Sequence, residues 1–282
     1  MEIQSVISRL LPVLLALALA SVVEAVVPLR QQARRANGRL ATNLWLLGVT
    51  LGLAMLLNLT LALGAAFVRE SGGGLLQLLQ SGPVVSFVVT LLALDGATYL
   101  VHRLMHQVPL LWRVHLVHHI DESVDATTAF RQHPIEGVLR FSFIAATAWT
   151  LGAPPEAVAI YRLLGALNSV LEHANIRVPR ALDRALVWLW VTPDMHKVHH
   201  SRERAETDSN YANLFSFYDR IFRTFTPSSR GPSVSYGIAG YDAPEHQSIG
   251  AVLWLPFRSR SSDVELLELS REPVGGQTNR RN

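Results

Sequence analysis

Long apolar runs separated by short polar loops dominate the first hundred residues of this chain. The first run extends from Val6 to Val27, the second from Leu44 to Val68, and a third opens at Pro83 and reaches about Val101. A helix needs about 20 mostly apolar residues to cross a hydrocarbon core about 30 Å thick. The pattern therefore predicts three transmembrane helices. Because more apolar runs follow the first one, that run is interpreted as a helix rather than a cleaved signal peptide.

A fourth apolar region, Val138 to Leu171, is broken near its middle by Gly152-Ala153-Pro154-Pro155. A Pro-Pro pair cannot continue a helix, so this region predicts a helical hairpin that crosses the bilayer or dips into it. Further on, Thr192-Pro193-Asp194 combines a capping hydroxyl, a proline and an acid, which is typical of a helix start. The predicted fold is an all-α polytopic membrane protein with about four to five transmembrane or membrane-inserted helices.

Composition supports this class. Apolar residues make up 49% of the 282 residues and charged residues only 17%, compared with about 25% charged residues in soluble domains. The absence of cysteine excludes disulfides, iron–sulfur clusters, thiolate zinc sites and cysteine nucleophiles. Any metal must therefore be held by nitrogen and oxygen. The basic residues lack interleaved aromatic residues, so nothing indicates nucleic-acid binding.

The arginines predict how the helices are oriented. Four of them lie between the first two apolar runs, whereas only Arg69 lies between the second and the third. By the positive-inside rule, the four-arginine loop is cytoplasmic. The third helix then runs inward and ends at the cytoplasmic boundary. The four arginines are Arg30, Arg34, Arg35 and Arg39.

Eight of the eleven histidines form one H-x-x-x-H and two H-x-x-H-H patterns. Residues four apart share a helix face, and the three rings of H-x-x-H-H span about 100° of a helix. Eight imidazoles are too many for one tetrahedral zinc and suit two metal ions, whereas chance clustering would explain a single pattern more readily than three. The patterns contain His102 and His106; His115, His118 and His119; and His196, His199 and His200.

Two more histidines are candidate ligands. His173 ends the predicted hairpin and so returns to the side that holds the three patterns. His133 precedes Pro134 and is either a ligand or a hydrogen-bonding group near the site. His246 is a lone histidine in a loop and is interpreted as a surface residue.

Asp95 precedes His102 by seven residues and His106 by eleven, so the three share one helix face to within about 20°. A carboxylate in a membrane helix is costly and usually has a task. Three roles remain open for it: a direct ligand, an acceptor that fixes the tautomer of a ligand ring, or a buried acid paired with a hydroxyl. Tyr99 lies near the same face as a packing or supporting residue. Asn175 and Asp194, beside histidine motifs, are further supporting candidates.

All-nitrogen coordination suits iron, copper, zinc or nickel. Two irons that share these ligands could activate O₂ and oxidise unactivated C–H bonds, which side chains cannot attack alone. A site at the bilayer surface would admit a lipid tail sideways and exclude water from the oxidant. The sequence thus predicts two iron ions, with zinc as a replacement in the purified protein, and a lipid substrate.

The chain also resembles the fatty acid hydroxylase superfamily, or sterol desaturase family, over roughly Asp95 to Thr226. The resemblance departs at Tyr218 and Arg223, where the family usually has a tryptophan and a glycine; both lie outside the histidine patterns. It rests on the three histidine patterns and on Thr127–Pro134, Glu172–Asn175, Asn210–Asn213 and Asp219–Phe222.

This resemblance implies a helical membrane enzyme with a cytosolic dinuclear metal site, which hydroxylates or desaturates fatty acyl chains, sterols or related lipids with O₂. It implies no catalytic residue beyond the metal ligands. Because no haem domain of cytochrome b5 type is fused to the chain, electrons would come from a separate cytochrome b5-like or ferredoxin-type protein. The implied ligands are His102, His106, His115, His118, His119, His173, His196, His199 and His200, with His133 in the family's histidine-proline motif.

The sequence predicts three segments: transmembrane helices in 1–82, the catalytic domain in 83–226, and a cytosolic segment with a flexible tail in 227–282. The protein is placed in a bacterial inner membrane. The alternative is a histidine-rich metal transporter or metal-binding protein, which would need ligands across the bilayer midplane rather than at one boundary. The sequence does not favour a zinc hydrolase, because the chain lacks the glutamate of the His-Glu-x-x-His motif. Arg103 follows His102 and Lys197 follows His196 where that motif has its glutamate.

Overall fold

The computed structural model describes residues 3–31 and 38–258. Arg34, Arg35 and the predicted flexible tail beyond Arg258 lie outside these residues. Within them every regular element is helical, and the only β-type pairing is an isolated bridge between Pro28 and Ile176. The prediction of an all-α protein is thereby confirmed.

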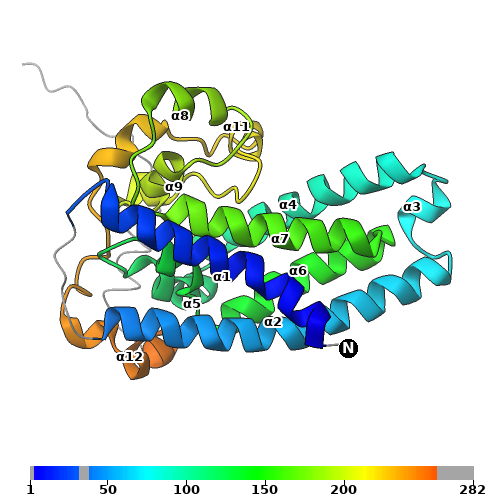
Figure 1. The fold of residues 1–282 in the computed structure, drawn as a ribbon, viewed down its shortest axis with the longest axis horizontal. Helices are drawn as coiled ribbons and strands as arrows, with labels where there is room; N and C mark the ends of the chain where they lie inside the picture. The colour runs from blue at the N-terminus through cyan, green and yellow to red at the C-terminus, as the bar shows by residue number, and fades with distance from the viewer. Residues whose placement is uncertain (1–2, 32–37, 259–282) are drawn as a thin grey trace, which may run out of the picture.

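Long helices run alongside one another and form an elongated bundle (Figure 1). The short α3 (Leu75–Leu78) joins two of them at the end of the bundle that lies farthest from the small helices. The long helices are α1 (Ile3–Val26), α2 (Arg39–Glu70), α4 (Pro83–Gln107), α6 (Pro134–Leu151) and α7 (Pro155–His173).

The opposite end of the bundle carries the small helices and most of the loops (Figure 1). This end brings together segments that are far apart in the sequence, because α1, α4 and α7 end there and α2 and α6 begin there. The small elements are α5 (Pro109–His119), η1 (Ala126–Phe130), α8 (Arg180–Leu186), α9 (Pro193–His199), α10 (Arg204–Thr207), α11 (Phe217–Ile221), η2 (Ser228–Ser233), η3 (Pro244–Gln247), α12 (Ile249–Trp254) and η4 (Leu255–Phe257).

Within the described residues, two helical segments are long and apolar enough to cross a membrane: Arg39–Leu78, which contains α2, and Pro83–Gln107, which is α4. Only 11% of the most apolar window of the first is buried inside the protein. On α2, the side chains of Leu56 and Phe67 are 70% and 72% exposed. Apolar surface of this kind suits lipid rather than water.

The hairpin predicted from the Pro-Pro pair is confirmed. Helix α6 ends at Gly152, whose φ of 60° lies in the left-handed region that glycine adopts readily. Helix α7 starts after Pro154, and Gln77 donates a hydrogen bond of 2.9 Å to the carbonyl of Gly152. The hairpin packs against α4 through a core that includes Leu94, Ile144 and Ala148.

The third helix is longer than its apolar run. Helix α4 continues from Pro83 through Gln107, about two turns beyond Val101, and so it includes both His102 and His106. The polar side chains in these last turns do not stop the helix, because tertiary partners at the end of the bundle satisfy them. The bundle thus delivers this histidine pair directly to the end where the small helices gather.

Candidate metal centre

Four helices supply the clustered histidines. Helix α4 carries one pair, α5 carries three, α7 ends in His173, and α9 with its first following residue carries the last three. Helix α9 starts where the sequence predicts, since the Thr192 hydroxyl accepts a hydrogen bond from the Met195 N–H at 3.3 Å. The caps and spacings of these short helices therefore determine which rings face inward.

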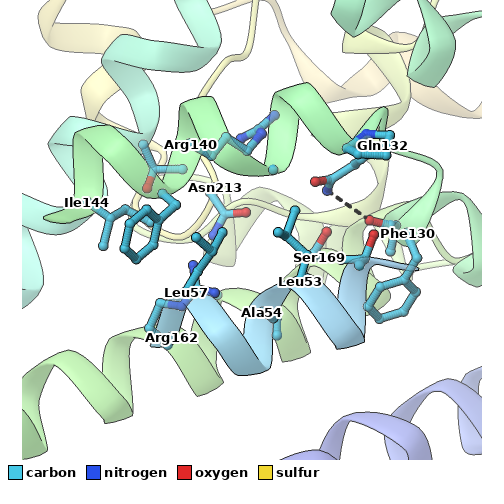
Figure 2. A pocket seen from close by; sticks show the side chains of 18 of the residues that line it. Leu53, Ala54, Leu57, Phe130, Gln132, Arg140, Ile144, Arg162, Ser169 and Asn213 are labelled. Carbon is cyan, nitrogen blue, oxygen red and sulfur yellow. Dashed lines mark hydrogen bonds between the residues drawn. The ribbon is translucent and has the colours of Figure 1, made fainter. Parts of the chain in front are cut away.

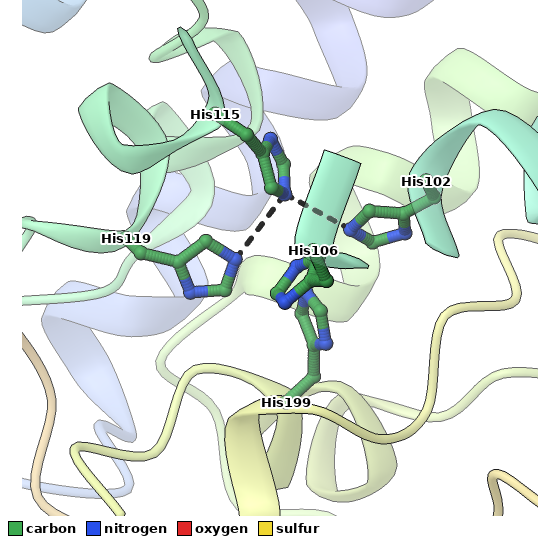
Figure 3. Close-up of side chains that lie close together, drawn as sticks. All are labelled: His102, His106, His115, His119 and His199. Carbon is green, nitrogen blue, oxygen red and sulfur yellow. Dashed lines mark hydrogen bonds between the residues drawn. The ribbon is translucent and has the colours of Figure 1, made fainter. Parts of the chain in front are cut away.

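The first group contains five histidines whose ligand atoms all lie within 4.8 Å of one another (Figure 3). The Nε2 atom of His115 lies 3.0 Å from Nε2 of His102 and 3.2 Å from Nε2 of His119. All five side chains are buried. The group consists of His102, His106, His115, His119 and His199.

The second group lies next to the first and contains four buried histidines, again with ligand atoms within 4.8 Å of one another. His173 is at its centre. Its Nε2 atom lies 3.1 Å from Nε2 of His118, 3.1 Å from Nε2 of His196 and 3.2 Å from Nε2 of His200. The rings of His119 and His200 are stacked with centroids 4.7 Å apart, so the two groups adjoin.

Backbone carbonyls determine the tautomer of four rings. The Nδ1 atoms of His102 and His118 lie 2.8 and 3.2 Å from the carbonyl oxygens of Tyr211 and Arg131. The Nδ1 atoms of His173 and His199 lie 2.7 Å from the carbonyl oxygens of Ser169 and Ser209. A carbonyl can only accept, so each Nδ1 carries the proton and each neutral ring has a bare lone pair on Nε2.

These lone pairs face one another, and their spacing shows whether the residues fit a metal. His118 and His173 direct bare Nε2 atoms at each other across 3.1 Å, with no proton between them. That contact is repulsive unless a cation lies between the two atoms. Two nitrogens that each lie about 2.1 Å from one ion, at about 90°, are about 3.0 Å apart. The donor set and its spacing therefore fit two metal ions, one in each group.

Burial keeps the rings neutral. It lowers the pKa of His118, His119, His196 and His200 well below the ordinary value, and the neighbouring histidines lower it further. The pKa of His199 falls to about 3 for the same main reason. A neutral imidazole is the form that binds metal, so the fold holds these side chains ready as ligands.

Carboxylates support two more rings of the first group. The Nδ1 atom of His115 lies 3.0 Å from Oε2 of Glu136, which is fully buried, and Arg140 binds the other oxygen of that carboxylate at 2.9 Å. The Nδ1 atom of His106 lies 3.2 Å from Oδ1 of Asp208. A carboxylate beside Nδ1 favours the proton on that atom and leaves Nε2 free for a metal.

His133 does not join either group. Its Nδ1 atom accepts a hydrogen bond from the Ile135 N–H at 3.2 Å, so the ring caps the start of α6. Its Nε2 atom lies 3.2 Å from the carbonyl oxygen of Leu253. Both ring nitrogens are therefore engaged in holding the backbone, which is the structural role of the histidine-proline motif here.

Asp95 supports the site from a distance. Its carboxylate accepts hydrogen bonds from the backbone N–H groups of Leu214 and Phe215 at 3.2 and 2.9 Å, and from the Tyr161 hydroxyl at 3.4 Å. It touches no ligand ring, so the structure does not support a role as ligand or tautomer-fixing acceptor. It anchors the loop whose residue Tyr211 accepts the hydrogen bond of His102.

The other three supporting candidates do not contact ligand rings through their side chains either. Tyr99 packs against Tyr218 and Phe222, and its hydroxyl hydrogen-bonds Thr224 at 2.9 Å. The Asn175 side chain exchanges hydrogen bonds with the backbone of Arg30. Asp194 pairs with Lys197 at 3.4 Å.

Residues 87–224 match the family model described as fatty acid hydroxylase. This part of the chain is a fatty acid hydroxylase domain. It contains all nine clustered histidines, and the resemblance found in the sequence is thereby confirmed.

Curated relatives of this fatty acid hydroxylase domain include lipid-modifying enzymes. An alkylglycerol monooxygenase of Xenopus tropicalis is 33% identical over 150 residues, which are 53% of this chain and 32% of that protein. The ornithine lipid hydroxylase OlsE of Rhizobium tropici is 28% identical over 156 residues, which are 54% of this chain and 45% of that protein. A very-long-chain aldehyde decarbonylase, GL1-9 of Oryza sativa subsp. japonica, is 31% identical over 144 residues, 50% of this chain and 54% of that protein.

The chain thus spans between about a third and about half of the length of these relatives. No solved structure matches the chain significantly.

Sequence reasoning missed the groups that orient the rings of the fatty acid hydroxylase domain. Four of them are backbone carbonyls, which no residue type signals. Glu136 carried a signal: with Arg140 it places a charged pair, four residues apart, in an otherwise apolar helix. Ionisable residues in such a helix commonly serve a functional site.

Proposed function

We propose that this protein is a membrane-bound non-haem diiron enzyme that hydroxylates or desaturates a C–H bond of a lipid with O₂. The observation that carries the proposal is the pair of adjoining buried histidine groups, five rings and four, with ligand atoms within 4.8 Å of one another in each. The relatives named above as a lipid monooxygenase and a lipid hydroxylase support the same reaction class.

In this proposal the first group holds one iron and the second holds the other. Two bound irons would supply reductive activation of O₂, and with it the oxidation of an unactivated C–H bond. The protein orients the rings through the carbonyls of Tyr211, Arg131, Ser169 and Ser209 and through the carboxylates of Glu136 and Asp208. Because all nine rings are buried, the fold also excludes water from the site.

The proposal places the site at the cytoplasmic face of a bacterial inner membrane, with four to five membrane-inserted helices including α2 and α4. Arg39, at the start of α2, pairs with Asp121, which follows His119 by two residues, and so a basic residue lies near the histidines as this orientation requires. A separate cytochrome b5-like or ferredoxin-type protein would deliver electrons there. The proposed segments remain 1–82, 83–226 and 227–282.

Two measurements test the proposal. Elemental analysis of the purified protein should give about two irons per chain, or zinc in their place. Mass spectrometry of lipids from cells with and without the gene should show a species that differs by one oxygen or by two hydrogens. Identical lipid profiles under several growth conditions, or a metal-free protein that still oxidises lipid, would contradict the proposal.

Single substitutions distinguish the two groups. We expect His199→Ala to lower metal content in the first group and His118→Ala to lower it in the second, with loss of lipid oxidation in both variants. The matched control is His133→Ala, which should retain both metals because its ring nitrogens bind backbone groups instead. Metal content per chain, measured on the folded fraction of each variant, is the readout.

A further inference from the structure

A cavity of about 190 Å³ lies between α2, α6 and α7 (Figure 2). Apolar side chains form much of its wall, including Leu53 and Leu57 from α2 and Phe141 and Ile144 from α6. None of the nine clustered histidines lines the cavity. However, Ser169 does, and its carbonyl accepts the Nδ1 proton of His173. The cavity is therefore separated from the second histidine group by one turn of α7.

The charges that line this cavity are positive. Arg140 and Arg162 are part of the lining, whereas no aspartate or glutamate is. Arg140 is already paired with Glu136 at 2.9 Å. The charge of Arg140 is thus compensated, and Arg162 is the lining arginine that could bind another anion.

Arg162 lacks a counter-ion in the described part of the chain. None of the ion pairs formed within residues 3–31 and 38–258 includes it. Its Nε atom is buried without a hydrogen-bond partner. A charged side chain in an apolar helix is costly unless it is paired, and an anionic group in the cavity would supply the partner that Arg162 lacks among the described residues.

We propose that the cavity binds a single-chain anionic amphiphile, with its carboxylate or phosphate on Arg162 and its chain against the apolar wall. This rests on the proposed function in so far as it makes the bound lipid the substrate. The parallel N–H donors of a guanidinium match the oxygens of a carboxylate or a phosphate. The volume lies below the roughly 300–1,000 Å³ of pockets that enclose a whole drug-sized ligand, so there is room for part of one chain only.

The position of Arg162 also indicates which part of the chain is oxidised. Arg162 precedes His173 by eleven residues on α7, which corresponds to about 16 Å of helix rise. An amphiphile anchored on Arg162 would direct its chain along the cavity toward Ser169, whose carbonyl accepts the Nδ1 proton of His173. In this proposal the carbon nearest the histidine groups therefore belongs to the chain and not to the anionic end.

Binding to the full-length, metal-loaded protein in detergent tests this. The probes are palmitate, hexadecyl phosphate and the uncharged hexadecanol, which share one chain length, so the two anionic probes separate carboxylate from phosphate recognition. Because a charge-assisted hydrogen bond contributes substantially to affinity, we expect at least one anionic probe to bind about ten- to a hundredfold more tightly than hexadecanol. Arg162→Gln should remove this preference and leave hexadecanol binding unchanged.

Two further variants complete the design. Arg184→Gln, an exposed arginine on α8, should bind all probes as the wild type does. Leu57→Glu adds an acid to the cavity wall, and should remove the anion preference without leaving Arg162 unpaired, which covers the case that Arg162→Gln does not fold. Equal binding of charged and uncharged probes by the wild type, or an anion preference that survives both cavity substitutions, overturns the inference.

Metal content and O₂ consumption are measured on the same samples. Anion-selective binding without oxidation of any lipid would contradict the proposed enzymatic function but support the anion-binding cavity. Oxidation of lipids without a preference for anions would support the enzymatic function and contradict the anion-binding cavity.

Discussion

The carboxylate of Glu136 joins the metal centre to the wall of the cavity. One of its oxygens lies 3.0 Å from Nδ1 of His115, and the other lies 2.9 Å from Nε of Arg140, which lines the cavity. Glu136 is fully buried, so both of these interactions occur away from bulk water and are screened little. Its negative charge favours the proton on Nδ1 of His115 and so leaves Nε2 of that ring free to bind metal.

Replacing Glu136 by glutamine tests this role. Glutamine keeps the shape but removes the charge, so we expect Glu136→Gln to weaken metal binding by about 10- to 100-fold. The measurement is a competition titration with a chelator of known affinity. The matched control is Glu156→Gln, an exposed acid at the start of α7, which should bind metal as the wild type does. Unchanged affinity in Glu136→Gln would mean that His115 needs no carboxylate partner.

Arg223 occupies a backbone conformation that suits glycine. Its φ is 58°, in the left-handed region, and its side chain is exposed. In this conformation a non-glycine residue destabilises the folded state by about 1–2 kcal/mol through steric strain. Glycine avoids that strain but costs about 0.5–1 kcal/mol in extra conformational entropy on folding. This strain gives a physical reason for the glycine that the family usually has at this position.

We therefore expect Arg223→Gly to raise the free energy of unfolding by about 0.5–1 kcal/mol. Thermal unfolding in detergent, compared with the wild type, is the measurement. Arg184→Gly provides the opposite case. Because Arg184 lies inside α8, this substitution should lower the free energy of unfolding by about 1 kcal/mol. A lower melting temperature for Arg223→Gly would show that its side chain makes a compensating contact.

At the scale of elements, close packing of η2 against α9 positions the third histidine pattern. Gly231 of η2 lies so close to Asp194 of α9 that a Cβ atom at this glycine would overlap the Asp194 carbonyl. Asp194 is two residues before His196, so any shift here displaces the start of α9 and with it the ligand rings that follow. The segment after residue 226, though outside the family match, therefore contributes to the site.

Gly231→Ala should separate these two elements. Because the overlapped atom belongs to the backbone, the overlap cannot be relieved by a rotamer change, and we expect a loss of at least about 1–3 kcal/mol in stability. Metal content should fall as well, since His196, His199 and His200 follow directly. Gly250→Ala is the control, as its added Cβ would meet nothing within 4 Å. Normal stability and metal content in Gly231→Ala would show that η2 is not needed to position α9.

Sequence predicts these elements well where the signal is local. The Pro-Pro break, the Thr192 cap and the four-residue spacing of His102 and His106 all act within one or two helical turns, and the helices appear where these signals predict. The apolar run of the third helix ends near Val101, but the helix continues through His102 and His106, because an apolar run reports lipid contact rather than helix length. His133 and Asp95 show the limit: whether a polar side chain reaches the metal centre depends on tertiary packing, which spacing does not encode.

At the scale of the whole molecule, the bundle brings together histidines that are almost a hundred residues apart in the sequence. The rings of His102 and His199 have centroids 4.6 Å apart, although one belongs to a long apolar helix and the other to a short one near its end. The repeated pattern predicted that such rings would share two metals, because too many ligands were present for one. The partition into five and four could not be predicted, since it depends on how α5 lies across both groups.

This partition makes the stability of the whole molecule depend on metal and pH together. In the metal-free protein, burial lowers the pKa of His199 to about 3, and the pKa of His118, His119, His196 and His200 is lowered as well. In the unfolded chain these side chains take up protons below about pH 6.5. Between the two pKa values the unfolded state therefore binds more protons, and the free energy of unfolding falls as pH falls.

Each such histidine should lower the free energy of unfolding by up to about 1.4 kcal/mol for every pH unit below about pH 6.5. We expect the melting temperature of the chelator-treated protein to be constant from about pH 8 to about pH 7 and to drop steeply from about pH 6 to about pH 5. Metal that binds only the folded state stabilises it by RT ln(1 + c/Kd), where c is the free metal concentration, so the loaded protein should melt at higher temperature and retain that advantage to lower pH. A chelator-treated protein that melts at the same temperature at pH 7 and pH 5 would contradict the buried, neutral histidine groups on which the metal centre depends.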